Sequence, residues 1–234
     1  MNVRTAILVD GAFYQKRASI LFGMPAPNGP VLPRQRADEL ITYCNRHIKQ
    51  EEGCSLYKIF YYDCPPSEKV IYHPLTRQNV YLKNTPLYEW STDFFQALAS
   101  KRKVVIRRGE LLESTAGYLL KEEATKALCA GTKRVEDLVE SDFYLDIKQK
   151  GVDMRIGLDI SSLAYKRQAD RIVLIAGDSD FVPAAKHARR EGVDFVLDPM
   201  WYTIKESLNE HIDGLASCVS KPPNNKTDPL YKGY

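Results

Sequence analysis

The sequence predicts an α/β fold, with a mostly parallel, Rossmann-like sheet flanked by helices. Short apolar runs rich in β-branched residues recur along the chain, as in strands that are buried on both faces. In the C-terminal half these runs alternate with stretches of helical period, which implies right-handed crossovers between parallel strands. The 234 residues are 44% hydrophobic and 27% charged, an ordinary globular balance at a length that allows one core.

Strands are expected where a short apolar run is closed by turn residues. The first run, Thr5 to Val9, ends in Asp10-Gly11. The second, Leu56 to Tyr62, ends in Asp63 and two nearby prolines, which cannot donate to a strand ladder. Further strands are expected at residues 104–106, 143–149, 171–176 and 193–197.

Helices are expected between these strands. One begins at Ala12, and another starts with Thr85 as its cap and Pro86 in its first turn. Residues 24–33 carry four prolines and are expected to form a loop. The other helices are expected at residues 36–50, 153–165 and 181–191, and the one capped by Thr85 extends to residue 100.

The middle of the chain lacks a clear period. Residues 110–141 are ambiguous, apart from a short helix near 122–128. We therefore expect a single domain over residues 1–220, with an irregular insertion at about 64–150. From residue 221 the chain is polar and rich in proline, so residues 221–234 are expected to form a disordered tail.

Composition narrows the function classes. A net charge of +3 is too small to establish a nucleic-acid partner. Five cysteines without a CxxC pair argue against a disulfide framework or a zinc ribbon, and they fit a reducing cytoplasm. No signal peptide and no apolar stretch of membrane-spanning length is visible. We expect a cytoplasmic protein without a membrane partner, and assembly into a homo-oligomer stays compatible with the sequence.

Aspartates follow the predicted strands. Ligand sites in an open parallel sheet lie outside the carboxyl ends of the strands. Asp10 follows the first strand, and Asp178 and Asp180 follow a later one. Asp153 begins the helix before that later strand, and Asp159 shares the apolar face of this helix. If the two strands are neighbours, five carboxylates gather at one edge of the sheet.

This gathering predicts a metal site. An inward-facing carboxylate such as Asp159 is costly to bury unless a cation or a hydrogen-bond network offsets the cost. Hard divalent cations such as Mg²⁺ prefer oxygen ligands, and they activate water and phosphodiesters. The predicted metal ligands are Asp10, Asp153, Asp159, Asp178 and Asp180, and all but Asp159 are also predicted to be catalytic.

Each aspartate has a simpler reading when it is taken alone. Asp10-Gly11 could be an ordinary turn. Asp153, Asp178 or Asp180 could cap a helix. Asp159 could pair with a neighbouring Lys or Arg. The metal-site hypothesis rests on their expected gathering at one end of the sheet.

Several motifs resemble the NYN domains of the LabA-like group, which are relatives of the PIN nucleases. The most specific lie between residues 148 and 181: Lys-Gln-Lys-Gly-Val-Asp at 148–153, Gly-Leu-Asp at 157–159 and Leu-Ile-Ala-Gly-Asp-Ser-Asp-Phe at 174–181. Ile-Leu-Val-Asp-Gly at 7–11, Tyr-Tyr-Asp-Cys-Pro at 61–65 and Arg-Arg-Gly at 107–109 also look like members of that group. The resemblance spans most of residues 4–198.

The resemblance implies a PIN-like fold and a ribonuclease site that depends on Mg²⁺ or Mn²⁺, with the five aspartates as its acidic residues. We therefore predict an endonuclease that hydrolyses RNA with two divalent ions, or one, while DNA is not excluded as a substrate. One position departs from the pattern: Phe13 stands where many NYN domains carry asparagine, three residues after the first aspartate.

Basic and aromatic residues near the aspartates are expected to contact nucleic acid. Two arginines end a strand at the same edge and suit bidentate phosphate contacts, and two lysines precede Asp153. Two aromatic residues directly follow Asp10, where their rings could stack on bases. Solvated charges and core packing are the alternative readings. The expected contacts are Arg107, Arg108, Lys148, Lys150, Phe13 and Tyr14.

Two other function classes remain open. The first is a non-catalytic RNA-binding or regulatory protein on the same fold, which Phe13 favours. The second is a phosphatase of the haloacid dehalogenase type, because Gly177-Asp-Ser-Asp180 looks similar to an acidic loop of that class. That class needs Asp-x-Asp after the first strand, whereas Asp10 is followed by Gly11 and Ala12.

Overall fold

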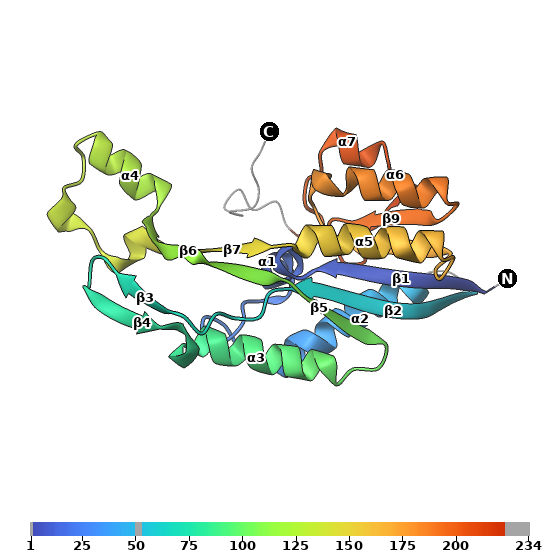
Figure 1. Ribbon diagram of the computed structural model, residues 1–234, viewed down its shortest axis with the longest axis horizontal. Helices are drawn as coiled ribbons and strands as arrows, with labels where there is room; N and C mark the ends of the chain where they lie inside the picture. Colours follow the sequence, from blue (N-terminus) through green and yellow to red (C-terminus); the bar gives the residue numbers. More distant parts are fainter. Residues whose placement is uncertain (1, 50–52, 223–234) are drawn as a thin grey trace.

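A six-stranded parallel sheet forms the centre of the protein. The computed structural model describes residues 2–49 and 53–222. Its sheet order is β10-β9-β8-β1-β2-β5, and the ribbon is drawn in Figure 1. The mostly parallel sheet predicted from the sequence is confirmed. The strands are β1 (Val3–Asp10), β2 (Cys54–Asp63), β5 (Val104–Arg108), β8 (Arg171–Ile175), β9 (Asp194–Asp198) and β10 (Gly214–Leu215).

The strand register brings three carboxyl ends together. β1 lies between β2 and β8, with Val9 opposite Tyr61 on one side and Ile175 on the other. Asp10 pairs with Tyr62, so it lies beside the last residues of β2. Residues that directly follow these strands therefore meet at one edge of the sheet.

Helices cover both faces of the sheet, and each face has its own core. Alternate side chains of β1 enter opposite cores, with Leu8 on one side and Ile7 on the other. Figure 1 shows these two helical layers. The Leu8 side is covered by α5 (Val152–Tyr165) and α6 (Val182–Arg190), and the Ile7 side by α1 (Gly11–Phe22), α2 (Pro33–Lys49) and α3 (Pro86–Ala99).

Helix α2 starts earlier than the sequence pattern suggests. It begins at Pro33 instead of residue 36. Proline suits a first helical position because its missing N–H would have no intrahelical partner there. The preceding loop is as expected and is held by a bridge between Pro25 and Val31.

Two antiparallel hairpins project from the main body at the left of Figure 1 and form what we call the arm. The two hairpins pack together through His73 of β3 and Tyr118 of β6, whose ring centres are 4.3 Å apart. Helix α3 and strand β5 fall inside the range 64–150 but belong to the main layers. The arm comprises β3 (Val70–His73), β4 (Gln78–Tyr81), β6 (Glu110–Leu120), α4 (Glu122–Cys129) and β7 (Phe143–Lys150).

Shorter elements complete the fold. Helix α7 (Glu206–Asn209) follows the last long strand, and a 3-10 helix, η4 (Ser179–Phe181), precedes α6. The other 3-10 helices are η1 (Leu82–Asn84), η2 (Val135–Asp137) and η3 (Glu140–Asp142). The disordered tail was expected at residues 221–234, and of these residues 223–234 lie outside the described residues. None of the helices in the described part of the chain has the length and apolar character that a membrane crossing requires.

Candidate metal centre

Asp10 lies at the carboxyl end of β1 and also caps the next helix. Its Oδ1 accepts a hydrogen bond of 3.1 Å from the backbone N–H of Phe13, so Asp10 is the N-cap of α1, where the sequence suggested a turn as the alternative. Burial is the main cause that raises the pKa of Asp10 to about 6. The charges of Asp153 and Asp63 raise it as well, against the opposing Phe13 hydrogen bond. Capping alone therefore does not describe this carboxylate, which also lies among like charges.

Asp63 was not predicted from the sequence as a site residue, but it lies beside Asp10 at the same edge of the sheet. It ends β2, the strand next to β1, and burial raises its pKa as well. Three donors hold its carboxylate: the backbone N–H of Cys64 at 2.8 Å, the Gln149 side chain at 2.8 Å and the Tyr61 hydroxyl at 3.1 Å. The signal was present in the sequence, because Asp63 follows its strand as Asp10 follows β1.

Asp153, Asp178 and Asp180 complete the group from the other side of β1. Asp153 lies in the first turn of α5, and its pKa is raised by partial burial and by the charges of Asp178 and Asp180. Asp178 accepts a hydrogen bond of 3.0 Å from the backbone N–H of Asp180 and so caps η4. Electrostatic coupling links these carboxylates into one acidic cluster: Asp10, Asp63, Asp153, Asp178 and Asp180.

Asp159 has partners of its own. Its Oδ2 accepts hydrogen bonds from Arg107 Nε and from the Tyr62 hydroxyl, both at 2.8 Å. Its negative charge also contributes, after burial, to raising the pKa of Tyr62. This network, which includes the Arg107 guanidinium, supplies the compensation that an inward-facing carboxylate needs without a metal ion. The alternative reading of Asp159, as the partner of a basic residue, describes this geometry.

Arg107 and Arg108 lie on opposite faces of β5, as neighbours in a strand must. The Arg107 guanidinium lies 5.5 Å from the ring centre of Phe60, on the α5 side. That of Arg108 lies 5.9 Å from the ring centre of Phe95, on the α3 side. They therefore cannot act as a pair on one phosphate, although both are exposed.

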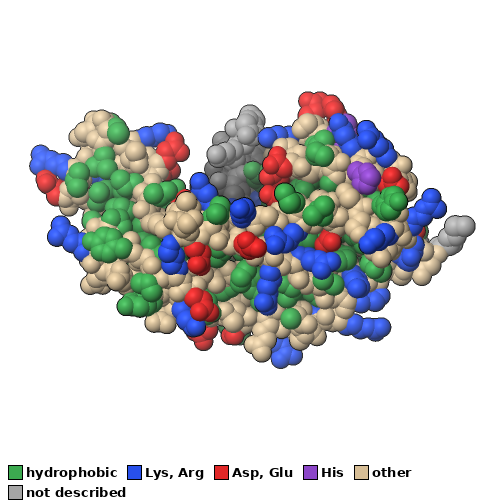
Figure 2. Space-filling view, in the orientation of Figure 1, with side chains coloured by type: hydrophobic (Ala, Val, Ile, Leu, Met, Phe, Trp, Pro, Cys, Tyr) green, Lys and Arg blue, Asp and Glu red, His purple; other side chains and the backbone are tan. Residues whose placement is uncertain are grey.

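The lysines of β7 stay at the surface. Lys148 and Lys150 are exposed, while Gln149 between them turns toward Asp63. Figure 2 shows Lys and Arg side chains spread over the visible face among Asp and Glu, and this mixture agrees with the small net charge. Because neighbouring side chains of a strand point to opposite faces, both lysines lie on the face of β7 opposite to Gln149.

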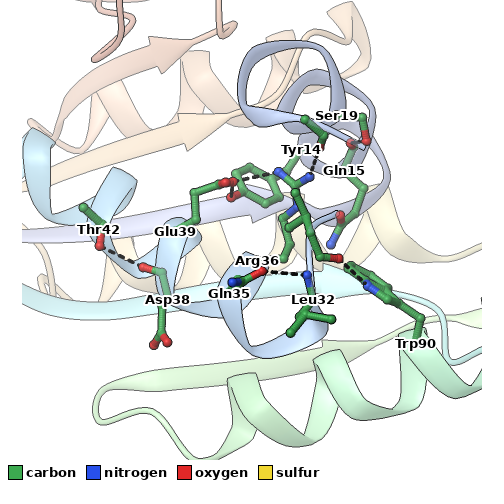
Figure 3. Close-up of polar contacts among 12 residues, drawn as sticks. Tyr14, Gln15, Ser19, Leu32, Gln35, Arg36, Asp38, Glu39, Thr42 and Trp90 are labelled. Carbon is green, nitrogen blue, oxygen red and sulfur yellow. Dashed lines mark hydrogen bonds and ion pairs between the residues drawn. The ribbon is translucent and has the colours of Figure 1, made fainter. Parts of the chain in front are cut away.

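Tyr14 belongs to the core. Its side chain is fully buried, and its hydroxyl donates a hydrogen bond of 3.1 Å to Glu39 (Figure 3). Glu39 in turn pairs with the buried Arg36 at 2.7 Å. Because this network ties α1 to α2, the Tyr14 ring is not accessible for base stacking. Phe13, by contrast, is partly exposed.

A cavity of about 380 Å³ opens beside the acidic cluster. Asp10 and Asp178 form part of its wall. The other lining residues come from α1, from the turn after β8 and from the segment after β9: Ala12, Phe13, Lys16, Gly177, Ser179, Tyr202, Thr203 and Lys205. Acidic, basic and aromatic side chains therefore face one space.

A second polar group is buried at the carboxyl end of β9, on the Ile7 side of the sheet. His47, Asp198 and Cys218 have potential metal-ligating atoms within 4.8 Å of one another. The two ring nitrogens of His47 face different partners, Asp198 Oδ2 at 2.8 Å and Cys218 Sγ at 3.3 Å. Asp198 also accepts from Tyr43, Ser217 and the backbone N–H of Met200. A hydrogen-bond network accounts for this group, because both Asp198 oxygens are already engaged.

The acidic cluster suits a hard cation. Carboxylates from β1, β2, the first turn of α5 and the turn after β8 offer oxygen ligands alone, which is the chemistry that Mg²⁺ and Mn²⁺ favour. The raised pKa values of Asp10, Asp63 and Asp153 reflect burial, to which neighbouring negative charges add for Asp10 and Asp153. A divalent cation would offset both effects.

Comparisons with known proteins identify a domain family for this chain. The family model of the NYN domain matches residues 72–200, more than half of the chain. This span includes Asp153, Asp178 and Asp180 and excludes Asp10 and Asp63. No curated protein matches the sequence. A solved structure of a Vibrio parahaemolyticus protein of unknown function is 13% identical, covers 92% of this chain and 91% of its own, and superposes with a TM-score of 0.44.

Proposed function

The chain belongs to the NYN domain family, and from this premise we propose that it is a metal-dependent endoribonuclease. The family lies within the PIN-like nuclease superfamily, which supports a hydrolase acting on nucleic acid. The observation that carries the proposal is the acidic cluster, in which Asp10, Asp63 and Asp153 interact around the carboxyl ends of parallel strands. The more specific assignment to the LabA-like group remains a proposal from the sequence motifs.

The acidic cluster would hold the metal. Asp10, Asp63, Asp153, Asp178 and Asp180 are the proposed ligands or close neighbours of Mg²⁺ or Mn²⁺. A bound ion of this kind supplies charge neutralisation and activation of water and phosphodiester. Three hydrogen bonds fix the orientation of the Asp63 carboxylate. In this orientation it could coordinate the metal ion or accept a proton. Asp159 is proposed to position Arg107.

Basic residues at the rim would hold the RNA backbone. Lys148 and Lys150 are exposed on the strand that leads directly into α5 and Asp153. Arg107 and Arg108 lie at the end of β5, beside Asp63 in the strand register, and would contact separate phosphates. We propose RNA as the substrate, and cleavage of the same sequence as DNA tests that choice. The five free cysteines fit the proposed cytoplasmic location.

The first test is cleavage of a mixed RNA pool with Mg²⁺ or Mn²⁺ and with a chelator. Cleavage should require the metal, and Asp178→Asn should reduce its rate by several orders of magnitude while the circular dichroism spectrum stays native. The matched control is Asp170→Asn, which removes a charge at the other end of β8, where Asp170 pairs with Arg4. Full activity in Asp178→Asn would contradict the proposed site.

A non-catalytic RNA-binding protein is the second candidate. The observation in its favour is Phe13 at a position where many NYN domains carry asparagine. The same assay decides between the two, because this candidate binds RNA with metal present and leaves it intact.

A further inference from the structure

The cavity beside the acidic cluster is built largely by residues outside the part of the chain that matches the NYN family model. Phe13 and Lys16 come from α1, and Tyr202 and Lys205 come from the segment after β9. All four lie beyond residues 72–200. Family membership therefore does not assign a ligand to this cavity, and its lining residues determine which ligand it can bind.

Two aromatic rings meet at one side of the cavity. The rings of Phe13 and Tyr202 lie edge to face, with their centres 5.9 Å apart. Gly177, in the turn after β8, permits this approach. A Cβ at that position would lie 2.6 Å from Phe13 Cε2 and 2.9 Å from Tyr202 Cδ1, closer than real contacts allow. The glycine thus leaves room for an aromatic wall next to Asp178.

Buried contacts fix the turn that carries Tyr202. The Arg17 side chain is 2% exposed, and it donates to the Met200 carbonyl through Nε at 3.1 Å and Nη2 at 2.8 Å. The same guanidinium lies 5.9 Å from the centre of the Tyr202 ring. From the other side, Asp198 Oδ1 accepts the Met200 N–H at 2.7 Å. The hydrogen-bond network of His47, Asp198 and Cys218 therefore also holds this turn in place.

The turn is also defined by its backbone. Met200 and Trp201 both adopt positive φ angles, 47° and 61°, which are uncommon for residues other than glycine. Such conformations persist where surrounding contacts determine them. The buried Arg17 and Asp198 contacts are of that kind, so the wall of the cavity is preformed.

Positively charged side chains line the same cavity as the carboxylates. Lys16 and Lys205 are exposed and line the same cavity as Asp10 and Asp178. Lys205 is oriented by a hydrogen bond of 3.2 Å from its Nζ to Ser179 Oγ. A ligand here meets aromatic rings, two ammonium groups and the acidic cluster at once. A nucleotide unit within an RNA strand presents the matching groups: a flat base, a phosphate on one side, and on the other side a second phosphodiester that can approach a metal.

We propose that this cavity binds one nucleotide of an RNA strand, next to the phosphodiester held at the acidic cluster. The base packs against Phe13 and Tyr202, and the phosphate is bound by Lys16 and Lys205, which line the same cavity. A volume of about 380 Å³ is near the lower end of small-molecule pockets, which suits a single nucleotide unit. The proposal rests on the proposed nuclease function for its position in the substrate, but the cavity can be tested without catalysis.

The first experiment measures binding in chelator. The wild type is titrated calorimetrically with 5′-AMP and 5′-UMP, with adenosine, and with inorganic phosphate. We expect the nucleotides to bind more tightly than either part alone. Tyr202→Ala and the double variant Lys16→Ala/Lys205→Ala should each weaken nucleotide binding by about tenfold or more. Tyr202→Phe should retain it, because the ring remains.

Matched controls lie on α5 and just beyond its end. Tyr165→Ala removes a tyrosine that is 74% exposed, and Lys166→Ala removes a neighbouring exposed lysine. Neither residue lines the cavity, so neither change should alter nucleotide binding. Equal affinity for phosphate and nucleotide, or unchanged binding in both cavity variants, would overturn the proposal. The lysine variant keeps the test decisive if Tyr202→Ala does not fold.

The second experiment separates the cavity from the nuclease. With Mn²⁺ and a short RNA, the cavity variants should raise KM by about tenfold and change kcat less. If the wild type cleaves RNA and the variants keep its KM, the cavity proposal falls while the function stands. If the wild type cleaves nothing but binds nucleotides through Tyr202 and the lysines, the nuclease proposal falls and the nucleotide site remains.

Discussion

At the scale of single residues, Asp10 links the site to stability. Its pKa is raised from 3.8 to about 6, chiefly by burial, so the folded protein keeps this proton at pH values where the unfolded chain has lost it. The metal-free protein should therefore lose stability as the pH rises from about 4 to about 6. The shift corresponds to about 3 kcal/mol at most. A divalent cation favours the ionised carboxylate, so its stabilising effect should grow over the same range.

The residue-scale prediction concerns Asp10→Asn. Asparagine keeps an oxygen for the Phe13 N–H, so the cap survives while the charge is lost. We expect a higher metal-free Tm than wild type at pH 8 and a flatter pH dependence of Tm between 4 and 6. Mn²⁺ at about 100 times its Kd should add roughly 2.7 kcal/mol to the wild type and little to the variant. If the variant melts lower in chelator and Mn²⁺ does not shift the wild type, these aspartates are turn and capping residues only.

At the scale of elements, Asp159 of α5 connects two strands, because it accepts hydrogen bonds from Tyr62 of β2 and Arg107 of β5. Arg107 and Asp159 have side chains that are 43% and 23% exposed, so solvent screens their attraction in part. A double-mutant cycle with Arg107→Ala and Asp159→Asn should give a coupling of about 0.5–1 kcal/mol in urea unfolding. Asp159→Asn should leave the Mn²⁺-induced rise in Tm unchanged, whereas Asp178→Asn should abolish it. If Asp159→Asn loses the Mn²⁺-induced rise in Tm, Asp159 is a metal ligand after all.

The elements also show what could be predicted from the sequence. The core strands were recognisable because apolar runs such as Thr5 to Val9 are buried on both faces. β6 was ambiguous because it is only partly buried, and polar residues interrupt its pattern. Asp63 was overlooked because the prolines that follow it suggested a strand end and nothing more. The opposite directions of Arg107 and Arg108 follow from strand geometry, but their partners depend on tertiary packing.

At the scale of the whole molecule, the arm contributes to the site only through its base. Gln149 of β7 donates to Asp63, and Cys64 Sγ contacts the Glu110 carbonyl at the start of β6. The outer part of the arm lies beyond both hydrophobic cores. It also exposes apolar side chains, and Val135 is 74% exposed. The stability of the sheet and the geometry of the acidic cluster should therefore not depend on the tip of the arm, the segment between the ends of β6 and β7.

The last prediction tests that independence. Leu120 and Phe143 are directly opposite each other in the β6–β7 hairpin, and beyond them the Lys121 N–H donates to the Asp142 carbonyl, so residues 122–141 can be replaced by a two-residue Asn-Gly turn without a change of register. The shortened protein should melt within a few degrees of the wild type, because no side chain of either main core is removed. Its Tm should still rise with Mn²⁺ to the same extent, because Gln149 and Asp63 are retained. As a matched control, Gln149→Ala in the full chain removes the base contact alone and should reduce the Mn²⁺ effect. A shortened protein that no longer responds to Mn²⁺ would show that the tip of the arm is needed to form the acidic cluster.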